Sequence, residues 1–163
     1  MKLRHLAAAA ALAVGSASSF AISLGGLNLS TGSAGFSNTP IAGLFTDTLT
    51  FTLTTASIAN GSITGVVNGN QDVDFTSIVI SGPGGPFNYT LLLPDPVEVW
   101  ATPAAGFTLG AGAYTLTLTG TNSASIGSYG GNFAVTPVPE PQTLALMLAG
   151  LGAVGFVARR RKF

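Results

Sequence analysis

The sequence lacks cysteine altogether and has a single histidine, His5, among its 163 residues. Without cysteine the chain forms no disulfide and offers no thiolate as a nucleophile or metal ligand. Ser-His-Asp triads and histidine zinc sites would all have to use His5, which lies at the N-terminal edge of the chain. The two shortages therefore argue against several common classes of hydrolase and zinc protein, and we expect a protein that is not an enzyme.

Lysine and arginine are absent from most of the chain. All six basic residues lie at the two ends, at Lys2, Arg4 and Arg159–Lys162. The body between them is weakly acidic, with carboxylates at Asp47, Asp72, Asp74, Asp95, Glu98 and Glu140. Proteins bind nucleic acid by neutralising its phosphates with lysine and arginine. A nucleic-acid partner is therefore excluded for the body, and only the basic tail suits anionic lipid.

The N-terminus has the pattern of a secretory signal peptide. Residues 1–21 combine a short basic start, an apolar run over residues 6–14 and a series of small residues. Ser19 and Ala21 occupy the −3 and −1 places of a cleavage site, and a cut after Ala17 is the alternative. The run is too short and too rich in alanine for a stable membrane-spanning helix. We expect residues 1–21 to be removed and the protein to be exported.

Alternating apolar residues and threonines dominate residues 22–136. Segments 44–55 and 112–121 place threonines on one phase and mostly apolar side chains on the other, as in strands with one buried face. Gly, Pro and Asn clusters separate the runs, and no helical period is present. This pattern predicts an all-β domain, an antiparallel β-sandwich of jelly-roll-like form. Weaker strands are expected at 22–30, 56–67, 73–80, 87–93, 97–101 and 130–136.

Residues 137–163 form a tail of different character. Prolines make residues 135–141 an extended linker, because each proline fixes φ and restricts the residue before it. Residues 143–158 are uncharged and would span about 24 Å as a helix, against about 30 Å for a bilayer core. Arg159, Arg160, Arg161 and Lys162 follow as a stop-transfer signal. We expect a transmembrane helix over 143–158, with the body on the outer side of the inner membrane.

The order of these parts resembles the PEP-CTERM sorting signal of Gram-negative bacteria. Val138, Pro139, Glu140 and Pro141 spell its Pro-Glu-Pro element, and the apolar segment and basic finish follow in sequence. The resemblance implies recognition and processing by the membrane protease-transferase exosortase. It further implies release or transfer of the protein to the cell surface, in association with exopolysaccharide or biofilm. An ordinary tail anchor is the alternative.

A second resemblance concerns a subgroup of such proteins with an FxDxF motif. Phe45, Asp47 and Leu49 match that motif with leucine in its last place. Asp47 falls on the apolar phase of its strand, so its carboxylate needs backbone N–H groups, hydroxyls or a cation as partners. We expect turn amides near a sheet rim to supply them. The resemblance carries no chemistry for these residues.

Residues 68–74 are the candidate metal site. Asn68, Asn70, Asp72 and Asp74 place oxygen atoms at alternate positions, a set of hard donors that suits Ca²⁺. The glutamate of an EF-hand loop is missing, since Val79 occupies its place. A hairpin turn with two carboxylates at the start of a strand is the other interpretation, and no other cofactor is expected.

Three further motifs were tested for chemistry. Residues 150–155 spell GxGxxG but follow no strand, so small residues of an apolar helix explain them better than a dinucleotide site. Residues 81–86 are glycine-rich without the lysine of a phosphate loop, and are expected to form a turn. Asp95 and Glu98 are close to Trp100 in the sequence, but nothing in the sequence pattern predicts a cleft in which two carboxylates could hydrolyse a glycoside. None of the three indicates an enzyme.

The threonine rows suggest one more function. Flat rows of threonine on a sheet can order water, but two rows without a repeat to align them are more simply solvent-facing strand residues. We therefore expect an exported, non-enzymatic protein of the cell surface or extracellular matrix. The alternative is a binding module for glycan, with or without Ca²⁺, or for ice.

Overall fold

The computed structural model describes residues 20–40, 42–66, 72–94, 97–123, 127–139 and 141–160. Most of the expected signal peptide therefore lies outside the described residues. The same holds for several residues singled out above, namely Asn68, Asn70, Asp95, Glu140, Arg161 and Lys162.

The described residues form eleven strands and one helix. The strands are β1 Phe20–Gly26, β2 Ser33–Asn38, β3 Gly43–Leu53, β4 Ser57–Val66, β5 Val73–Gly82, β6 Gly85–Asn88, β7 Thr90–Leu93, β8 Val99–Ala101, β9 Phe107–Leu109, β10 Gly112–Asn122 and β11 Ser128–Pro137. The helix α1 spans Pro141–Arg160. The prediction of a mainly β protein with a C-terminal helix is confirmed.

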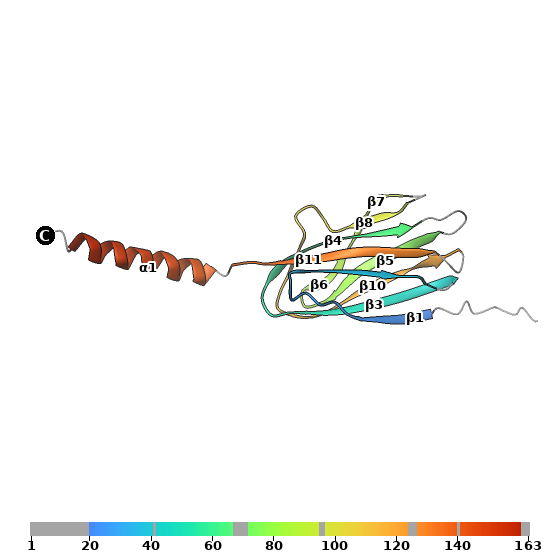
Figure 1. The fold of residues 1–163 in the computed structure, drawn as a ribbon, viewed down its shortest axis with the longest axis horizontal. Helices are drawn as coiled ribbons and strands as arrows, with labels where there is room; N and C mark the ends of the chain where they lie inside the picture. The colour runs from blue at the N-terminus through green and yellow to red at the C-terminus, as the bar shows by residue number, and fades with distance from the viewer. Residues whose placement is uncertain are drawn as a thin grey trace, which may run out of the picture.

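The strands make two sheets that face each other (Figure 1). The first has the order β1-β3-β10-β5-β6, and the second has the order β2-β11-β4-β8-β7 with β9 also paired to β4. All pairings are antiparallel except that of β1 with β3, which is parallel. The expectation of a wholly antiparallel fold was wrong for β1, because a loop carries the chain across to β2 in the other sheet before β3 begins.

Alternation along β3, β10 and β11 builds the core between the sheets. Leu49, Leu116 and Leu118 are buried on the inner face of the first sheet, and Phe133 is buried on the second. Phe51 of β3 packs against Phe133 of β11 with ring centroids 4.7 Å apart. Burial of such side chains contributes roughly 1.5–3 kcal/mol each, so the facing rows hold the layers together.

Some strand boundaries differ from the sequence-based expectation. Residues 87–93 were expected to form one strand, but Tyr89 interrupts them and the chain passes from β6 in the first sheet to β7 in the second. β2 and β9 were not predicted, because Ser33–Asn38 is small and polar and Phe107–Leu109 is too short for a period. A cut after Ala21 would remove the start of β1, whereas a cut after Ala17 would leave that strand whole.

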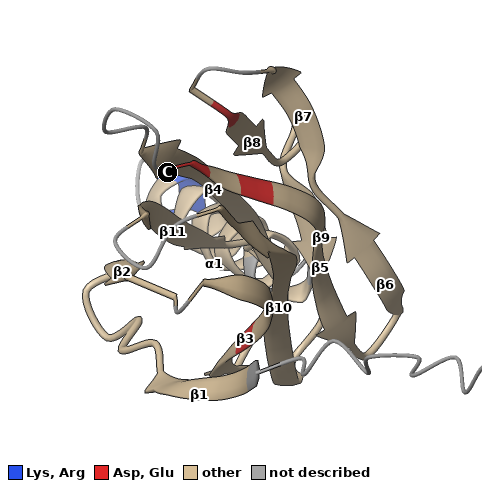
Figure 2. Cartoon of the chain, turned by 90° about the vertical axis from the view of Figure 1, so that its right-hand side faces the viewer, with Lys and Arg blue, Asp and Glu red and all other residues tan. Residues whose placement is uncertain are grey.

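The two ends of the body differ. β11 is followed closely by α1, which extends away from the body, while β1 begins at the opposite end of the body (Figure 1). Viewed along the long axis from that opposite end, acidic residues are seen on β3, on β5 and beside β8 (Figure 2). The basic residues in the last turn of α1 therefore lie apart from the body and its described carboxylates (Figure 1).

Candidate functional site

The tail leaves the body through a short connection. β11 ends at Pro137, and the Val138 N–H donates to the carbonyl oxygen of Ala56 at 2.9 Å, which fixes the start of the connection on the turn between β3 and β4. Val138 and Pro139 are exposed, and α1 begins at Pro141. The structure therefore displays the described part of the Pro-Glu-Pro element just outside the folded body.

The helix α1 exposes its apolar side chains on every side. Leu146 and Val154 are 74% and 68% exposed, and the other large side chains of the helix are exposed as well: Leu144, Met147, Leu148, Leu151, Phe156 and Val157. A helix that is apolar all round requires an apolar environment or a protein partner. Arg159 and Arg160 lie in its last turn, where positive charge interacts favourably with the helix dipole.

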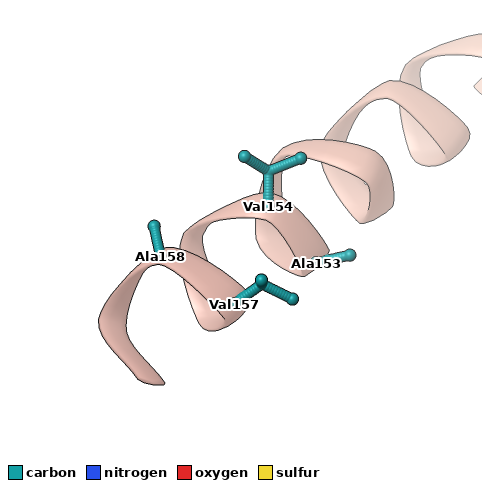
Figure 3. Close-up of a pocket in the computed structure, with 4 residues that line it drawn as sticks. All are labelled: Ala153, Val154, Val157 and Ala158. Carbon is teal, nitrogen blue, oxygen red and sulfur yellow. The ribbon is translucent and has the colours of Figure 1, made fainter. Parts of the chain in front are cut away.

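The hollow beside the end of α1 is not a ligand site. Ala153, Val154, Val157 and Ala158 line it, all from one helix, and the space beside them is open to solvent (Figure 3). The GxGxxG motif lies in the same helix, as expected from its apolar surroundings. An added Cβ at Gly150, Gly152 or Gly155 would meet nothing within 4 Å, so no packing against the body explains these glycines.

The expectation of a transmembrane helix over 143–158 is not supported. In the described part of the chain, no helix combines the length and the apolarity needed to cross a membrane.

Comparison with protein families decides what the tail is. A family model for the PEP-CTERM protein-sorting motif matches residues 137–162. The chain carries a PEP-CTERM sorting motif. The sequence-based recognition of this tail is confirmed, and the motif implies export, membrane-associated sorting and processing by an exosortase.

Two solved structures are similar to part of the chain. The pre-peptidase C-terminal domain of a Bacillus anthracis collagenase shares 16% identity, with a TM-score of 0.38 and coverage of 74% of this chain and 96% of that one. PliG, a periplasmic inhibitor of g-type lysozyme from Aeromonas hydrophila, shares 14% identity, with a TM-score of 0.34 and coverage of 73% and 100%. No curated protein matches the chain.

The FxDxF-like residues all point into the interior. Phe45, Asp47 and Leu49 are buried, and Asp47 has no exposed surface. Asp47 Oδ2 accepts hydrogen bonds from the Tyr129 hydroxyl at 2.5 Å and from Asn38 Nδ2 at 2.8 Å. Because β3 lies in one sheet and Asn38 and Tyr129 lie in the other, this carboxylate connects the two sheets.

The partners of Asp47 differ from the expectation of turn amides. A hydroxyl and a side-chain amide bind one carboxylate oxygen, while the buried Oδ1 has no partner among the described residues. Phe45 also stacks on Tyr129, with ring centroids 6.0 Å apart and planes 15° apart. Burial, followed by the hydrogen bond and the negative charge of Asp47, raises the pKa of Tyr129 above its usual value. These contacts make the motif a structural connection.

The candidate calcium residues are only partly described. Asp72 and Asp74 are half-buried at the start of β5, while Asn68 and Asn70 lie outside the described residues. The Asp72 N–H donates to Ser123 Oγ, and the Ser123 N–H donates to the Asp72 carbonyl oxygen. Across the residues that the structure describes, no three His, Cys, Asp or Glu side chains are gathered as metal ligands. The calcium site stays a prediction.

The remaining candidates have structural roles. Glu98 Oε2 accepts a hydrogen bond from the Phe75 N–H at 2.7 Å, which secures the start of β5, and Trp100 is half-buried against the core. The glycine-rich segment forms the turn between β5 and β6, and Gly84 and Gly85 there have φ of 95° and 119°. Such left-handed conformations favour glycine, which explains the composition of this turn.

The two threonine rows lie side by side in register. β3 and β10 are neighbours, and their outward residues pair as Thr46 with Thr119, Thr48 with Thr117 and Thr50 with Thr115. No repeat in the sequence aligns these rows, because strand neighbours 65–73 positions apart leave no local signal. The structure aligns them through the pairing of β3 with β10.

Proposed function

We propose that this chain is an exported, non-enzymatic surface or matrix protein that an exosortase sorts and processes through its tail. The observation that carries the proposal is the PEP-CTERM motif at residues 137–162, displayed outside the body on a short exposed connection. Association with exopolysaccharide at the cell surface follows from the family resemblance and belongs to the same proposal.

The geometry of the tail suits such processing. Pro139 and Pro141 each disfavour a helical conformation for the residue before them, and Pro139 is exposed at the end of the body. Proteases commonly bind substrates as extended strands. The exposed apolar surface of α1 supplies a region that a membrane-associated enzyme can hold.

The buried carboxylates support a non-enzymatic body. Asp47 binds Tyr129 and Asn38 between the sheets, and Glu98 binds the backbone of β5. Each therefore has a structural partner where a catalytic acid or base would need access to substrate.

The test is the intact mass of the protein recovered from membrane and extracellular fractions of its native host. We expect the recovered mass to lack everything beyond about Pro139–Pro141. Glu140→Ala should reduce processing, whereas Gln142→Ala, two positions along in the same tail, should leave it unchanged. Retention of residues 143–163 in the wild-type chain would make the tail an ordinary anchor and would overturn the proposal.

The threonine array favours a second candidate function, binding to ice. Its hydroxyl and methyl groups repeat about every 4.8 Å between strands and about every 6.8 Å along each strand. The outward residues paired between β3 and β10 include no charge and no aromatic ring. The surface of ice is a repeating, uncharged lattice of water molecules, and a regular array of threonine side chains can match such a lattice.

Thermal hysteresis of the purified chain tests this second candidate. We expect hysteresis that Thr48→Lys abolishes, because a long charged side chain at the centre of the array would hold a flat lattice away. Thr64→Lys on β4 of the other sheet is the matched control and should retain it. Absence of hysteresis in the wild-type chain would exclude ice binding.

A further inference from the structure

The strand β7 is the most apolar exposed strand of the body. Leu91, Leu92 and Leu93 are 39%, 59% and 57% exposed, and Val97 in the following loop is 45% exposed. Figure 2 shows β7 and β8 at the margin of the molecule, away from β1. Large apolar side chains gathered on an exposed strand mark a surface for association.

β7 is also the end strand of its sheet. It pairs with β8 on one side, and no described strand pairs with its other side. An open strand edge offers unpaired N–H and C=O groups to another strand, and proteins commonly protect such edges with lysine, proline or irregular pairing. β7 carries no charge and no proline. Its one irregularity, between Leu91 and Leu93, is in the pairing with β8.

The other sheet edges are better protected. β6 contains Pro86, which has no N–H to donate. Among its described side chains β1 exposes one large apolar side chain, Ile22 at 39%, and the exposed residues of β2 are small or polar: Ser33, Gly35 and Ser37. β7 is therefore the edge at which pairing with another chain would bury most apolar surface.

We propose that β7 pairs with β7 of a second copy of this chain, antiparallel and about a two-fold axis. A strand that pairs with itself must not bring like charges together, and Thr90–Leu93 has none. Such pairing sets leucine beside leucine or threonine and satisfies the open backbone groups of both copies. A second copy therefore supplies hydrogen-bond partners for the open backbone groups of β7 and apolar side chains that cover its leucines.

The strand order fixes the direction of the two tails. β7 is antiparallel to β8, β8 to β4 and β4 to β11, so β7 runs opposite to β11. Antiparallel pairing of two β7 strands thus sends the two β11 strands, and the tails that follow them, toward opposite ends of the joined sheet. The attachment of each tail to a cell surface rests on the proposed sorting function. If both tails are attached in this way, the dimer joins two surfaces that face each other.

The absence of cysteine makes the pairing testable by single-cysteine crosslinking of the full chain in detergent. Facing residues of an antiparallel pair have Cα atoms about 4.5–5.5 Å apart, within the range that a disulfide spans. Leu91→Cys, Leu92→Cys and Leu93→Cys are oxidised separately, and we expect a disulfide-linked dimer in at least one. Val66→Cys, at an exposed apolar position on β4, is the matched control and should give none.

A second variant separates pairing through β7 from association through α1. Leu92→Lys should raise the dimer dissociation constant about tenfold or more in sedimentation experiments, while Val66→Lys should leave it unchanged. Equal crosslinking at position 66 and in β7, no crosslinking at any β7 position, or an unaltered Leu92→Lys dimer would each overturn the proposal. A failure of exosortase processing would leave these results untouched, so the two proposals fail separately.

Discussion

At the scale of single residues, Asp47 is a buried acidic side chain that joins the two sheets. Its carboxylate has no exposed surface, and both of its hydrogen-bond donors come from the opposite sheet. Removing a partner from a buried charged group costs roughly 1–3 kcal/mol or more, because the desolvated group is left unpaired. The hydroxyl of Tyr129 should therefore matter for stability.

We predict that Tyr129→Phe lowers the free energy of unfolding by about 1–3 kcal/mol, since Asp47 Oδ2 loses a hydrogen-bond donor. Tyr89→Phe is the matched control. The Tyr89 hydroxyl is buried with no partner among the described residues, so its removal should be neutral or stabilising. Denaturant unfolding of both variants is the measurement, and equal destabilisation would show that the bond to Asp47 is not the cause.

The same tyrosines predict a loss of stability in alkali. Burial raises the pKa of Tyr89 and of Tyr129 above the usual 10.0, so both keep their protons in the folded state where the unfolded chain loses them. Below pH 10 the two tyrosines leave the free energy of unfolding unchanged. Above pH 10 each tyrosine lowers the free energy of unfolding by up to about 1.4 kcal/mol per pH unit. Unfolding measured from pH 9 to pH 11 should show this decline, with a smaller slope in Tyr129→Phe. A flat profile would contradict the prediction.

The sequence predicted part of this cluster. Asp47 stood out because it lies on the apolar phase of its strand, and the absence of lysine and arginine limited its expected partners to backbone N–H groups, hydroxyls or a cation, of which turn amides were predicted. Asn38 and Tyr129 could not be predicted, because the hydrogen bonds join residues 9 and 82 positions apart. Only the stacking of the sheets brings those side chains together.

At the scale of elements, the strongest periodic segments were predicted best. Segments 44–55 and 112–121 became β3 and β10 with boundaries shifted by at most two residues. Weaker signals failed where tertiary structure decides the outcome, as at the sheet change around Tyr89 and in the short strand β9. The register of the threonine rows depends on which strands become neighbours, which alternation within one strand does not specify.

The pairing of β11 with its neighbours leads to a packing prediction. A Cβ added at Gly131 would meet the Phe36 ring at 2.7 Å, the Ser62 carbonyl oxygen at 2.8 Å and Ile63 at 2.9 Å. We expect Gly131→Ala to lower the free energy of unfolding by about 1–3 kcal/mol through overpacking. In Gly35→Ala, the matched control on the adjacent strand, the Cβ meets only the Gly131 carbonyl oxygen at 3.8 Å. Equal thermal midpoints in the two variants would contradict this account.

At the scale of the whole molecule, the body and α1 are separate units. The described side chains of α1 are all exposed, so the helix contributes no burial to the body. A chain ending at Pro139 keeps the hydrogen bond from Val138 to Ala56 and loses the helix. We expect its free energy of unfolding to lie within about 0.5 kcal/mol of the full chain, measured by denaturant in the same detergent. A larger loss would show that α1 packs on the body.

The connection between body and tail also sets how the domain would stand on a surface. Only residues 138–140 lie between β11 and α1, and three extended residues reach about 10 Å. A domain attached through this connection would lie close to its support. It would rotate little relative to the connection, because Val138 is hydrogen-bonded to Ala56 in the turn between β3 and β4. If the proposed sorting places the domain on a surface, the turn at Ala56 would lie within about 10 Å of the support, and the end of the body farthest from the tail would be the part most accessible to other molecules.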